Sequence, residues 1–174
     1  MREGIPFRIL VSDADETSTE TSPAKLVEAL SSLKAESVME KLSGDVIVLG
    51  ADTVVSQDGR ILGKPASFEE AEEMIRLIEG RAHEVYTGVT LIRKIGAARV
   101  KRVFSVRTSV HVREMSDAEI RAYIALGESY DKAGAYAIQG AFGKYIDGFT
   151  GDRDNVIGLP VSDVKKVLKE WGYV

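Results

Sequence analysis

Apolar runs of strand length alternate along this chain with segments of helical periodicity, and this alternation restricts the fold more than any other feature of the sequence. The runs that we expect to form strands are bounded by glycine, proline or polar residues, and they comprise residues 8–11, 46–49, 54–55, 61–62, 84–92 and 100–112. Asp58-Gly59 predicts a tight hairpin between two of them. Because strands and helices follow one another in mixed order, we expect an α/β domain. Its mixed, twisted sheet would be flanked by helices, with two lobes around a cleft.

Cap residues mark where the helices should begin. Ser22-Pro23 offers an N-cap followed by proline at the first helical position, and leucines recur at helical spacing over residues 26–33. Ser67–Glu70 and Ser116–Glu119 both have the Ser-x-x-Glu form of a capping box. A last helix is expected around residues 164–171, where the apolar residues share one face. These signals predict four helices distributed along the chain.

Length and composition exclude several classes of protein. A chain of 174 residues fits one domain, which we expect to span residues 1–174. Its 44% hydrophobic content is too high for an intrinsically disordered protein. No apolar run approaches the roughly 20 residues that cross a bilayer, and the N-terminal segment lacks the pattern of a signal peptide. Without cysteine there is no disulfide framework or thiolate metal site. We therefore expect a cytoplasmic protein that does not bind membranes.

The charge argues against duplex nucleic acid as a partner. The net charge is −4, whereas proteins that bind a duplex usually present a basic face to the phosphates. The one dense basic stretch lies within residues 93–102, and we interpret it as a solvated hairpin turn.

Carboxylates gather directly after the first apolar run. Asp13, Asp15 and Glu16 fall within four positions and repel one another unless a cation lies among them. This pattern is typical either of a divalent-metal site, since hard cations take carboxylate oxygens, or of a solvated acidic loop.

Two further groups of polar residues occupy turns. Asp52-Thr53 ends the most apolar run, where an acidic side chain is either a buried cap or a base and metal ligand. Lys64-Pro65 follows the hairpin, and an ammonium on a fixed backbone suits phosphate. The glycine-rich stretches 131–140 and 151–160 allow close approach to a ligand, and the Gln139 amide can read a base edge. We assign no role to His83 or His111.

Together these segments resemble the Maf family of nucleoside triphosphate pyrophosphatases. The matching stretches follow in order over nearly the whole chain, at residues 4–7, 12–16, 34–35, 49–55, 59–65, 80–89, 131–140 and 154–160. Residues 51–53 and 133–140 are similar to the branch that acts on dTTP and UTP. The resemblance implies the Maf fold, hydrolysis between the α- and β-phosphates, and release of a monophosphate and pyrophosphate.

The resemblance also implies roles for particular residues. Asp52 would be the general base for the attacking water, and Glu16 with Asp52 would hold Mg²⁺ or Mn²⁺. Lys34 and Lys64 would neutralise the phosphate charge, while Thr53 and Gln139 would help to select the base. The family is often dimeric, so we expect a homodimer.

One departure from the family pattern stands at the start of the chain. The family normally begins with a strand and a Ser-x-Ser-x-Arg-Arg loop, upstream of the segment that matches Gly4-Ile5-Pro6-Phe7. This chain starts three residues before Gly4, so we expect it to lack that strand and that loop. The loop would bind the triphosphate, and loss of the strand should expose apolar surface.

Two other functions fit parts of the sequence. Asp13-Ala14-Asp15-Glu16-Thr17 matches the Asp-x-Asp-x-Thr pattern of haloacid-dehalogenase-like phosphatases, with Asp13 as nucleophile and Asp15 as acid/base. Against it, we expect no apolar strand ahead of Gly151, where that family's late acidic motif would lie. The other alternative is a catalytically impaired protein that binds nucleotides or regulates cell division, as the family's association with septum formation suggests.

Overall fold

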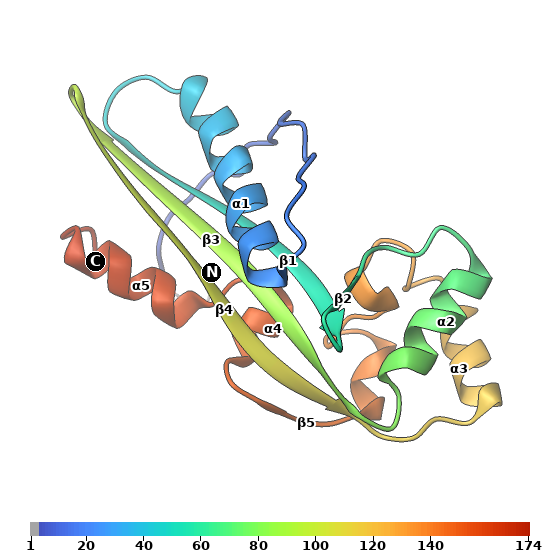
Figure 1. Cartoon of the computed structure of the whole chain (residues 1–174). Coiled ribbons are helices and arrows are strands. Elements are labelled where there is room, and N and C mark those ends of the chain that lie inside the picture. The colour runs from blue at the N-terminus through green and yellow to red at the C-terminus, as the bar shows by residue number, and fades with distance from the viewer. Residues whose placement is uncertain (1–3) are drawn as a thin grey trace.

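The fold was analysed in a computed structural model, which describes residues 4–174. Its centre is one sheet of five strands in the order β2-β1-β3-β4-β5 (Figure 1). The strands are β1 (Val46–Gln57), β2 (Arg60–Leu62), β3 (Ala82–Ile95), β4 (Ala98–Val112) and β5 (Ile146–Thr150). The expected α/β class and the helix-flanked sheet are confirmed. All four strand pairs are antiparallel, so the expected mixture of strand directions is not found among these strands.

Tight turns explain much of this arrangement. Asp58 and Gly59 have φ of 51° and 81°, as the predicted hairpin between β1 and β2 requires. A second hairpin at Gly96 joins β3 to β4, and the basic residues 93–102 lie on it, as expected. Arg99 and Lys101 of this hairpin pair with Glu36, so part of its charge is neutralised by the neighbouring helix.

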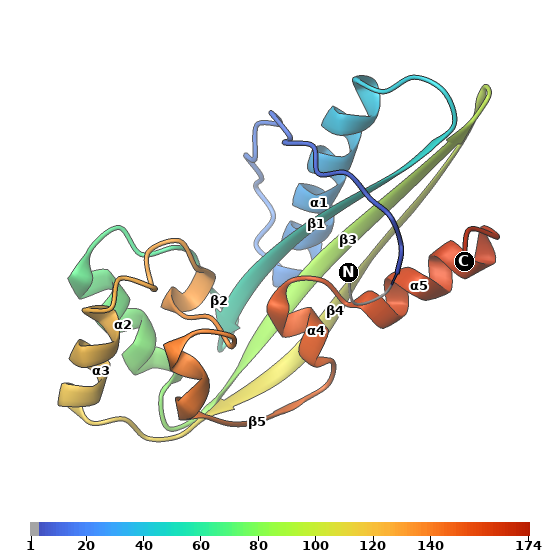
Figure 2. The same ribbon diagram turned by 180° about the vertical axis from the view of Figure 1, so that it is seen from behind.

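Helices cover both faces of the sheet (Figures 1 and 2). Helix α1 (Pro23–Glu40) lies on one face, and α4 (Arg153–Ile157) and α5 (Val161–Glu170) lie on the other. Each face has its own apolar cluster, one around Ala35, Val38 and Ile92 and one around Leu91, Val164 and Leu168. No helix within residues 4–174 has the length and apolarity of a membrane span.

Helix α1 differs in part from the leucine face suggested by the sequence, because Leu30 is buried as expected but small side chains make the closest approach to the sheet. Leu33 is 39% exposed, whereas Val27, Ser31 and Ala35 are buried. The reason is the close approach of the sheet. A Cβ at Gly88 would lie 2.2 Å from the backbone of Val27, so only glycine on the strand and small residues on the helix fit.

A second lobe is built around α2 (Phe68–Ile78) and α3 (Asp117–Ile124), beside the end of the sheet where β2 lies. The predicted capping box of α3 is present in full; at α2, Ser67 accepts from the backbone N–H of Glu70. The 3₁₀ turns η1 (Ala133–Ala135) and η2 (Ala141–Tyr145) complete the lobe.

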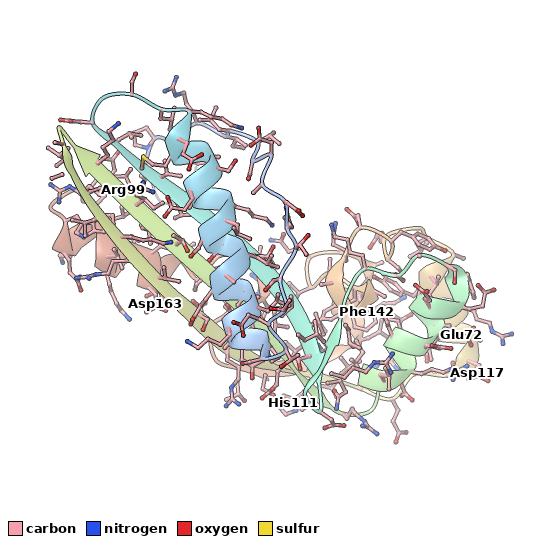
Figure 3. All side chains as sticks on the ribbon, turned by 45° about the horizontal axis from the view of Figure 1, so that its top comes forward. Glu72, Arg99, His111, Asp117, Phe142 and Asp163 are labelled. Atoms are coloured by element: carbon pink, nitrogen blue, oxygen red, sulfur yellow. The ribbon has the colours of Figure 1, made fainter. Side chains whose placement is uncertain are left out.

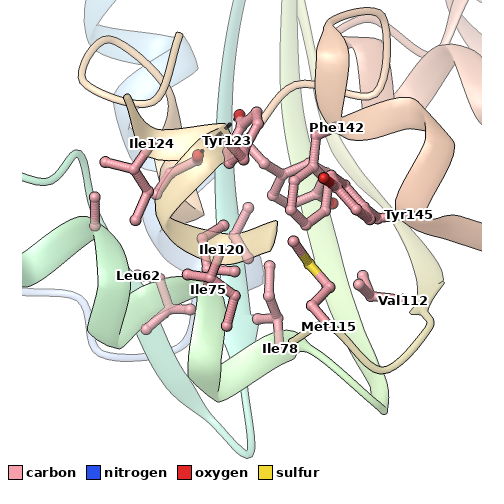
Figure 4. Close-up of a cluster of buried hydrophobic side chains, with 14 of the residues drawn as sticks. Leu62, Ile75, Ile78, Val112, Met115, Ile120, Tyr123, Ile124, Phe142 and Tyr145 are labelled. Atoms are coloured by element: carbon pink, nitrogen blue, oxygen red, sulfur yellow. Dashed lines mark hydrogen bonds between the residues drawn. The ribbon is translucent and has the colours of Figure 1, made fainter. Parts of the chain in front are cut away.

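The core of this lobe is largely aliphatic and aromatic. Figure 4 shows Tyr123, Phe142 and Tyr145 clustered beside Ile78, and the rings of Tyr123 and Phe142 are 4.9 Å apart between centroids. The lobe's surface carries ion pairs instead. In Figure 3, Glu72 and Asp117 mark the lobe's outer side, and Arg76 pairs with them at 2.7 and 2.8 Å.

Two strand predictions were wrong. Residues 8–11 form no strand, and the side chains of Ile9 and Val11 are 82% and 85% exposed. An apolar run becomes a buried strand only when another strand pairs with it, and within residues 4–174 this run has no strand partner. The second error concerns residues 46–49 and 54–55, which we expected to be separate strands but which form the single strand β1.

The expectation of no apolar strand ahead of Gly151 is confirmed, although β5 lies there. It is an edge strand whose residues are mostly exposed, so it lacks the apolar pattern of a buried strand.

Candidate active site

A pocket of about 370 Å³ lies between the two lobes. One wall comes from β1. This strand pairs with β2 only at Val55–Gln57, so no described strand pairs with the outer edge of residues 46–54. The opposite wall comes from the segment around η1 and from the end of α4. The lining residues are Ala51, Asp52, Thr53, Val55, Lys64, Val85, Asp131, Lys132, Ala133, Tyr136, Ala137, Ile138, Gln139, Val156, Ile157 and Gly158.

At one end of the pocket, a single ammonium group joins two carboxylates. Lys34 of α1 lies with its Nζ 2.5 Å from Oδ1 of Asp52 and 3.1 Å from Oε2 of Glu16. Asp52 projects from the face of β1 that α1 covers. Gly50 lies on the same face and, having no side chain, allows the helix to approach. Glu16 comes from the N-terminal loop, and its side chain is 53% exposed against 13% for Asp52. Three segments far apart in sequence therefore converge on one cation.

Burial and charge act against each other at this cluster. Burial raises the pKa of Asp52, and the nearby positive charges of Lys34 and Lys64 oppose that rise only in part. Burial lowers the pKa of Lys34, but its hydrogen bonds and charge interactions with Asp52 and Glu16 outweigh burial and leave that pKa raised. Lys34 thus stays protonated, and Asp52 is a stronger base than an exposed aspartate.

The other residues singled out by the sequence lie along the same pocket. Lys64, Thr53 and Gln139 all line it. The backbone N–H of Gly134 donates to the carbonyl of Gly63 at 3.0 Å, which ties the segment that carries Lys64 to the one that carries Gln139. The structure therefore brings all six predicted site residues to one pocket and to the ion-paired cluster at its end.

Behind the pocket wall lies a buried histidine to which we assigned no role from the sequence. His83 is 2% exposed, and its Nε2 lies 2.6 Å from the hydroxyl of Tyr136, a lining residue. Burial lowers the pKa of His83 to about 4, so the ring is neutral at neutral pH.

The acidic loop does not form the site of the phosphatase alternative. Asp13 accepts hydrogen bonds from Ser37 and Lys41 at 2.6 and 2.7 Å, on the outer side of α1. Asp15 bonds to Thr17 in its own loop. Neither lines the pocket, and no strand leads into this loop in residues 4–174. Of the three loop carboxylates, only Glu16 reaches Lys34.

The carboxylates of this cluster supply part of what a divalent cation requires. Asp52 and Glu16 present hard carboxylate oxygens around one point, which the cationic Nζ of Lys34 now adjoins. Across residues 4–174 no cluster of three histidine, cysteine, aspartate or glutamate side chains could enclose a metal. Mg²⁺ is often held by one or two carboxylates together with substrate phosphates and water, so the residues fit a cation that arrives with its substrate.

Sequence reasoning missed residues on the Thr53 side of the pocket. Thr87 lies opposite Thr53 in the β1–β3 register, and their Oγ1 atoms are 2.8 Å apart. Asn155, fully buried at the start of α4, contacts Thr87 through its backbone carbonyl at 2.9 Å. Nothing in the sequence indicated this group, because it depends on strand register and on the position of α4. Lys132 also lines the pocket, paired with Asp131 at 2.5 Å.

Comparison with known proteins gives one consistent result. The family model described as "Maf-like protein" matches residues 1–171. A dTTP/UTP pyrophosphatase of Bacillus thuringiensis subsp. konkukian (strain 97-27) is 44% identical over 169 residues, covering 97% of this chain and 86% of the relative. Proteins of the same name from Bacillus cereus strains ZK / E33L and ATCC 10987 / NRS 248 are each 45% identical over 97% of this chain, and 86% and 81% of their lengths are covered.

Proposed function

This chain belongs to the Maf family, and from that premise we propose that it hydrolyses dTTP and UTP to the monophosphate and pyrophosphate. One observation carries the proposal. Lys34 joins the partly buried Asp52 to Glu16, and Asp52 lines a pocket that Lys64 and Gln139 also line. Such a pocket offers a base, cations and an amide together, as a nucleotide requires.

In this proposal Asp52 acts as the general base. A water molecule attacks the α-phosphorus, its proton passes to the Asp52 carboxylate, and the bond from the α-phosphorus to the bridging oxygen breaks. Pyrophosphate leaves with the electron pair of that bond. Burial raises the pKa of Asp52, and a base with a raised pKa accepts a proton more readily than an exposed aspartate.

Lys34 and Lys64 provide the positive charge. Lys34 is ion-paired with Asp52, so it is oriented before the substrate binds, and Lys64 lines the same pocket, where its charge lowers the pKa of Asp52. Charge that is already in place stabilises the negative charge that develops on the phosphate oxygens without further reorganisation. We assign Lys132 to the same group, since it also lines the pocket.

We infer that Asp52 and Glu16 hold Mg²⁺ or Mn²⁺ together with the substrate phosphates. A bound divalent cation would neutralise phosphate charge and act as a Lewis acid. Glu16 is the more exposed of the two carboxylates and can adjust to the cation, while Asp52 is fixed on the sheet. Omission of the metal, or chelation with EDTA, should therefore abolish activity.

Pyrophosphate release from dTTP, UTP, CTP, GTP and ATP with Mg²⁺ or Mn²⁺ tests the proposal. We expect release with a preference for dTTP and UTP, and we expect Asp52→Asn to reduce kcat by at least about 100-fold, the scale of a general base. Asp13→Asn is the matched control, because this exposed carboxylate bonds only to α1 and should change kcat less than about twofold.

Two other results would each support a different function. Loss of activity in Asp13→Asn, with Asp52→Asn active, would support the haloacid-dehalogenase-like phosphatase. Tight nucleotide binding with no turnover at any metal concentration would support the nucleotide-binding or cell-division regulator. The homodimer and the cytoplasmic location stay predictions, to be checked by sedimentation and by fractionation of cells.

A further inference from the structure

Behind the pocket, a short chain of hydrogen bonds connects the sheet to α4. The Thr53 and Thr87 hydroxyl oxygens are 2.8 Å apart, and Thr87 Oγ1 donates to the backbone carbonyl of Asn155 at 2.9 Å. Thr87 and Asn155 are both fully buried, while Thr53 is partly exposed and lines the pocket. Figure 2 shows α4, which begins at Arg153, lying over β3 at this point. This series of hydrogen bonds therefore leads from the protein interior to one hydroxyl group that faces the pocket.

The number of available hydroxyl hydrogens determines the direction of both hydrogen bonds in this series. A carbonyl oxygen can only accept, so the single hydroxyl hydrogen of Thr87 points to Asn155. Thr87 then has no hydrogen left for Thr53. The 2.8 Å contact between the two threonines must use the hydrogen of Thr53, which points away from the pocket. Thr53 Oγ1 consequently offers only lone pairs to a ligand.

Asn155 is held so that this direction cannot easily reverse. Its side-chain amide donates to the carbonyl of Val85 and to Thr108 Oγ1, at 3.1 and 3.0 Å. Thr108 in turn donates to the carbonyl of Asp152 at 2.8 Å. These bonds anchor the first turn of α4 to β3 and β4, so the carbonyl of Asn155 stays aimed at Thr87. Every donor of this network has an acceptor, which makes it rigid, although Asn155 Oδ1 accepts no hydrogen bond from the described residues.

The pocket side of the Thr53 hydroxyl is open. Gly158 is the neighbour there, and a Cβ added to it would lie 3.5 Å from Thr53 Oγ1. With glycine in place, this space is available to a ligand atom. Gly158 has φ of 115°, so other residues are strained at that position.

We infer that Thr87 is a positioning residue which makes Thr53 Oγ1 an obligate acceptor, so that the pocket selects a base whose ring nitrogen carries a hydrogen. The N3–H of uracil and thymine can donate to this oxygen, whereas the N3 of cytosine is itself an acceptor and would face lone pairs. This inference rests on the proposed function, and it takes the base to lie beside Thr53, which lines the pocket. It adds the source of the selectivity, which lies in a buried side chain outside the pocket.

The test measures binding, so it does not depend on turnover. Dissociation constants for α,β-methylene-UTP and α,β-methylene-CTP, with Mg²⁺, are measured by calorimetry for wild type, Thr87→Val and Thr87→Ser. We expect wild type to bind the uridine analogue more tightly than the cytidine analogue, by on the order of tenfold or more in the dissociation constant. This is the difference between a hydrogen bond to Thr53 and an unpaired polar contact. In Thr87→Val the hydrogen of Thr53 becomes free to point into the pocket, so the preference should fall to within about threefold. Thr87→Ser keeps the hydroxyl and should keep the preference.

A purely structural role for Thr87 would weaken both analogues equally and leave their ratio unchanged, and that result would overturn the inference. So would a wild-type ratio near one. If Thr87→Val does not fold, Thr53→Val at the partly exposed position serves instead, and persistence of the preference there would also overturn it. Absence of pyrophosphate release from UTP, with the binding preference intact, would refute the proposed function but not this inference.

Discussion

Asp52 and His83 lie on either side of the pocket wall, and burial shifts their pKa values in opposite directions. Burial raises the pKa of Asp52 and lowers that of His83 to about 4, so the neutral form is favoured in both. The two differ in what surrounds them. Asp52 has Lys34 and Lys64 nearby, whereas in the described residues His83 Nδ1 has no hydrogen-bond partner. Asp52 can therefore work as an ionised base, while His83 is suited to staying uncharged.

The low pKa of His83 makes the stability of the protein depend on pH. Unfolded, this histidine titrates near 6.5, so between pH 6.5 and about 4 the unfolded chain binds more protons than the folded one. The free energy of unfolding should fall as pH drops through this window, by about 3 kcal/mol from His83 alone. Above pH 6.5 this contribution is fully present. Urea unfolding of wild type and His83→Gln at a series of pH values measures it as the difference between the two curves.

His111 supplies the control for that series. It lies opposite Ala82 on the neighbouring strand and is exposed. Burial is the larger cause of the low pKa of His83 and the charge of His111 the smaller one, so His111→Gln should keep most of the wild-type pH dependence. Curves for wild type and His83→Gln that run parallel from pH 6.5 to 4 would show that His83 has the same pKa in the folded and unfolded states, and would contradict the prediction. The buried contact with Tyr136 would then need another explanation.

At the scale of elements, α1 is the part whose position the site depends on. Two glycines of the sheet, Gly50 and Gly88, set its distance, and a Cβ on either would meet backbone atoms of the helix at 2.6 and 2.2 Å. Backbone atoms cannot move aside as a side chain can. Gly88→Ala should therefore push α1 outward, destabilise the protein by about 1–3 kcal/mol, and separate Lys34 from Asp52. Urea unfolding and kcat/KM measure the two effects.

Gly148→Ala tests whether the effect is specific to α1. This glycine also lies in a strand, β5, but a Cβ there meets nothing within 4 Å. Its substitution should change stability by less than about 0.5 kcal/mol and leave kcat/KM unchanged. An equal loss of activity in both variants would mean that strand glycines matter for a reason other than the distance of α1.

The sequence predicts an element well when the residues that determine it lie close together along the chain. The α3 capping box and the Asp58-Gly59 turn were predictable because each is encoded within four residues. The buried face of α1 was not, since Ser31 and Ala35 are buried only because Gly50 approaches them from another strand.

The same limit applies to the site. Asp52, Lys64 and Gln139 attract attention in the sequence because they stand beside glycine or proline, and the family resemblance assigned them roles. The turn expected at Asp52 is absent, since β1 continues through it. Thr87 has no local signal, because its partner Thr53 is defined by the register of two strands.

For the whole molecule, the pocket is the place where two units meet, and the core of the second unit includes side chains from the ends of the strands. One unit is the sheet with α1 on one face and α5 on the other, and the second is the α2–α3 lobe with its own core. The sheet contributes Asp52 and Thr53, and the lobe contributes the segment with Tyr136 and Gln139. A nucleotide in this pocket would contact both units at once.

Ligand binding should therefore stabilise both units together. A ligand that binds only the folded state, at 100 times its Kd, adds about 2.7 kcal/mol to the free energy of unfolding. For a chain of this size that corresponds to a rise in Tm of about 5–10 °C. We expect this rise with α,β-methylene-UTP and Mg²⁺. Hydrogen exchange should slow both in residues 51–55 of β1 and in residues 136–139 of the lobe, because the phosphates and the base contact different units.

Inorganic triphosphate with Mg²⁺ is the matched control, since it carries the phosphates without the base. It should slow exchange around Asp52 but leave residues 136–139 close to their rate in the free protein. If the full nucleotide also protects only β1, then the base does not reach Gln139. The lobe would then act as a scaffold for Lys64 alone, and base selection would have to be located on the sheet side, at Thr53 and the residues behind it.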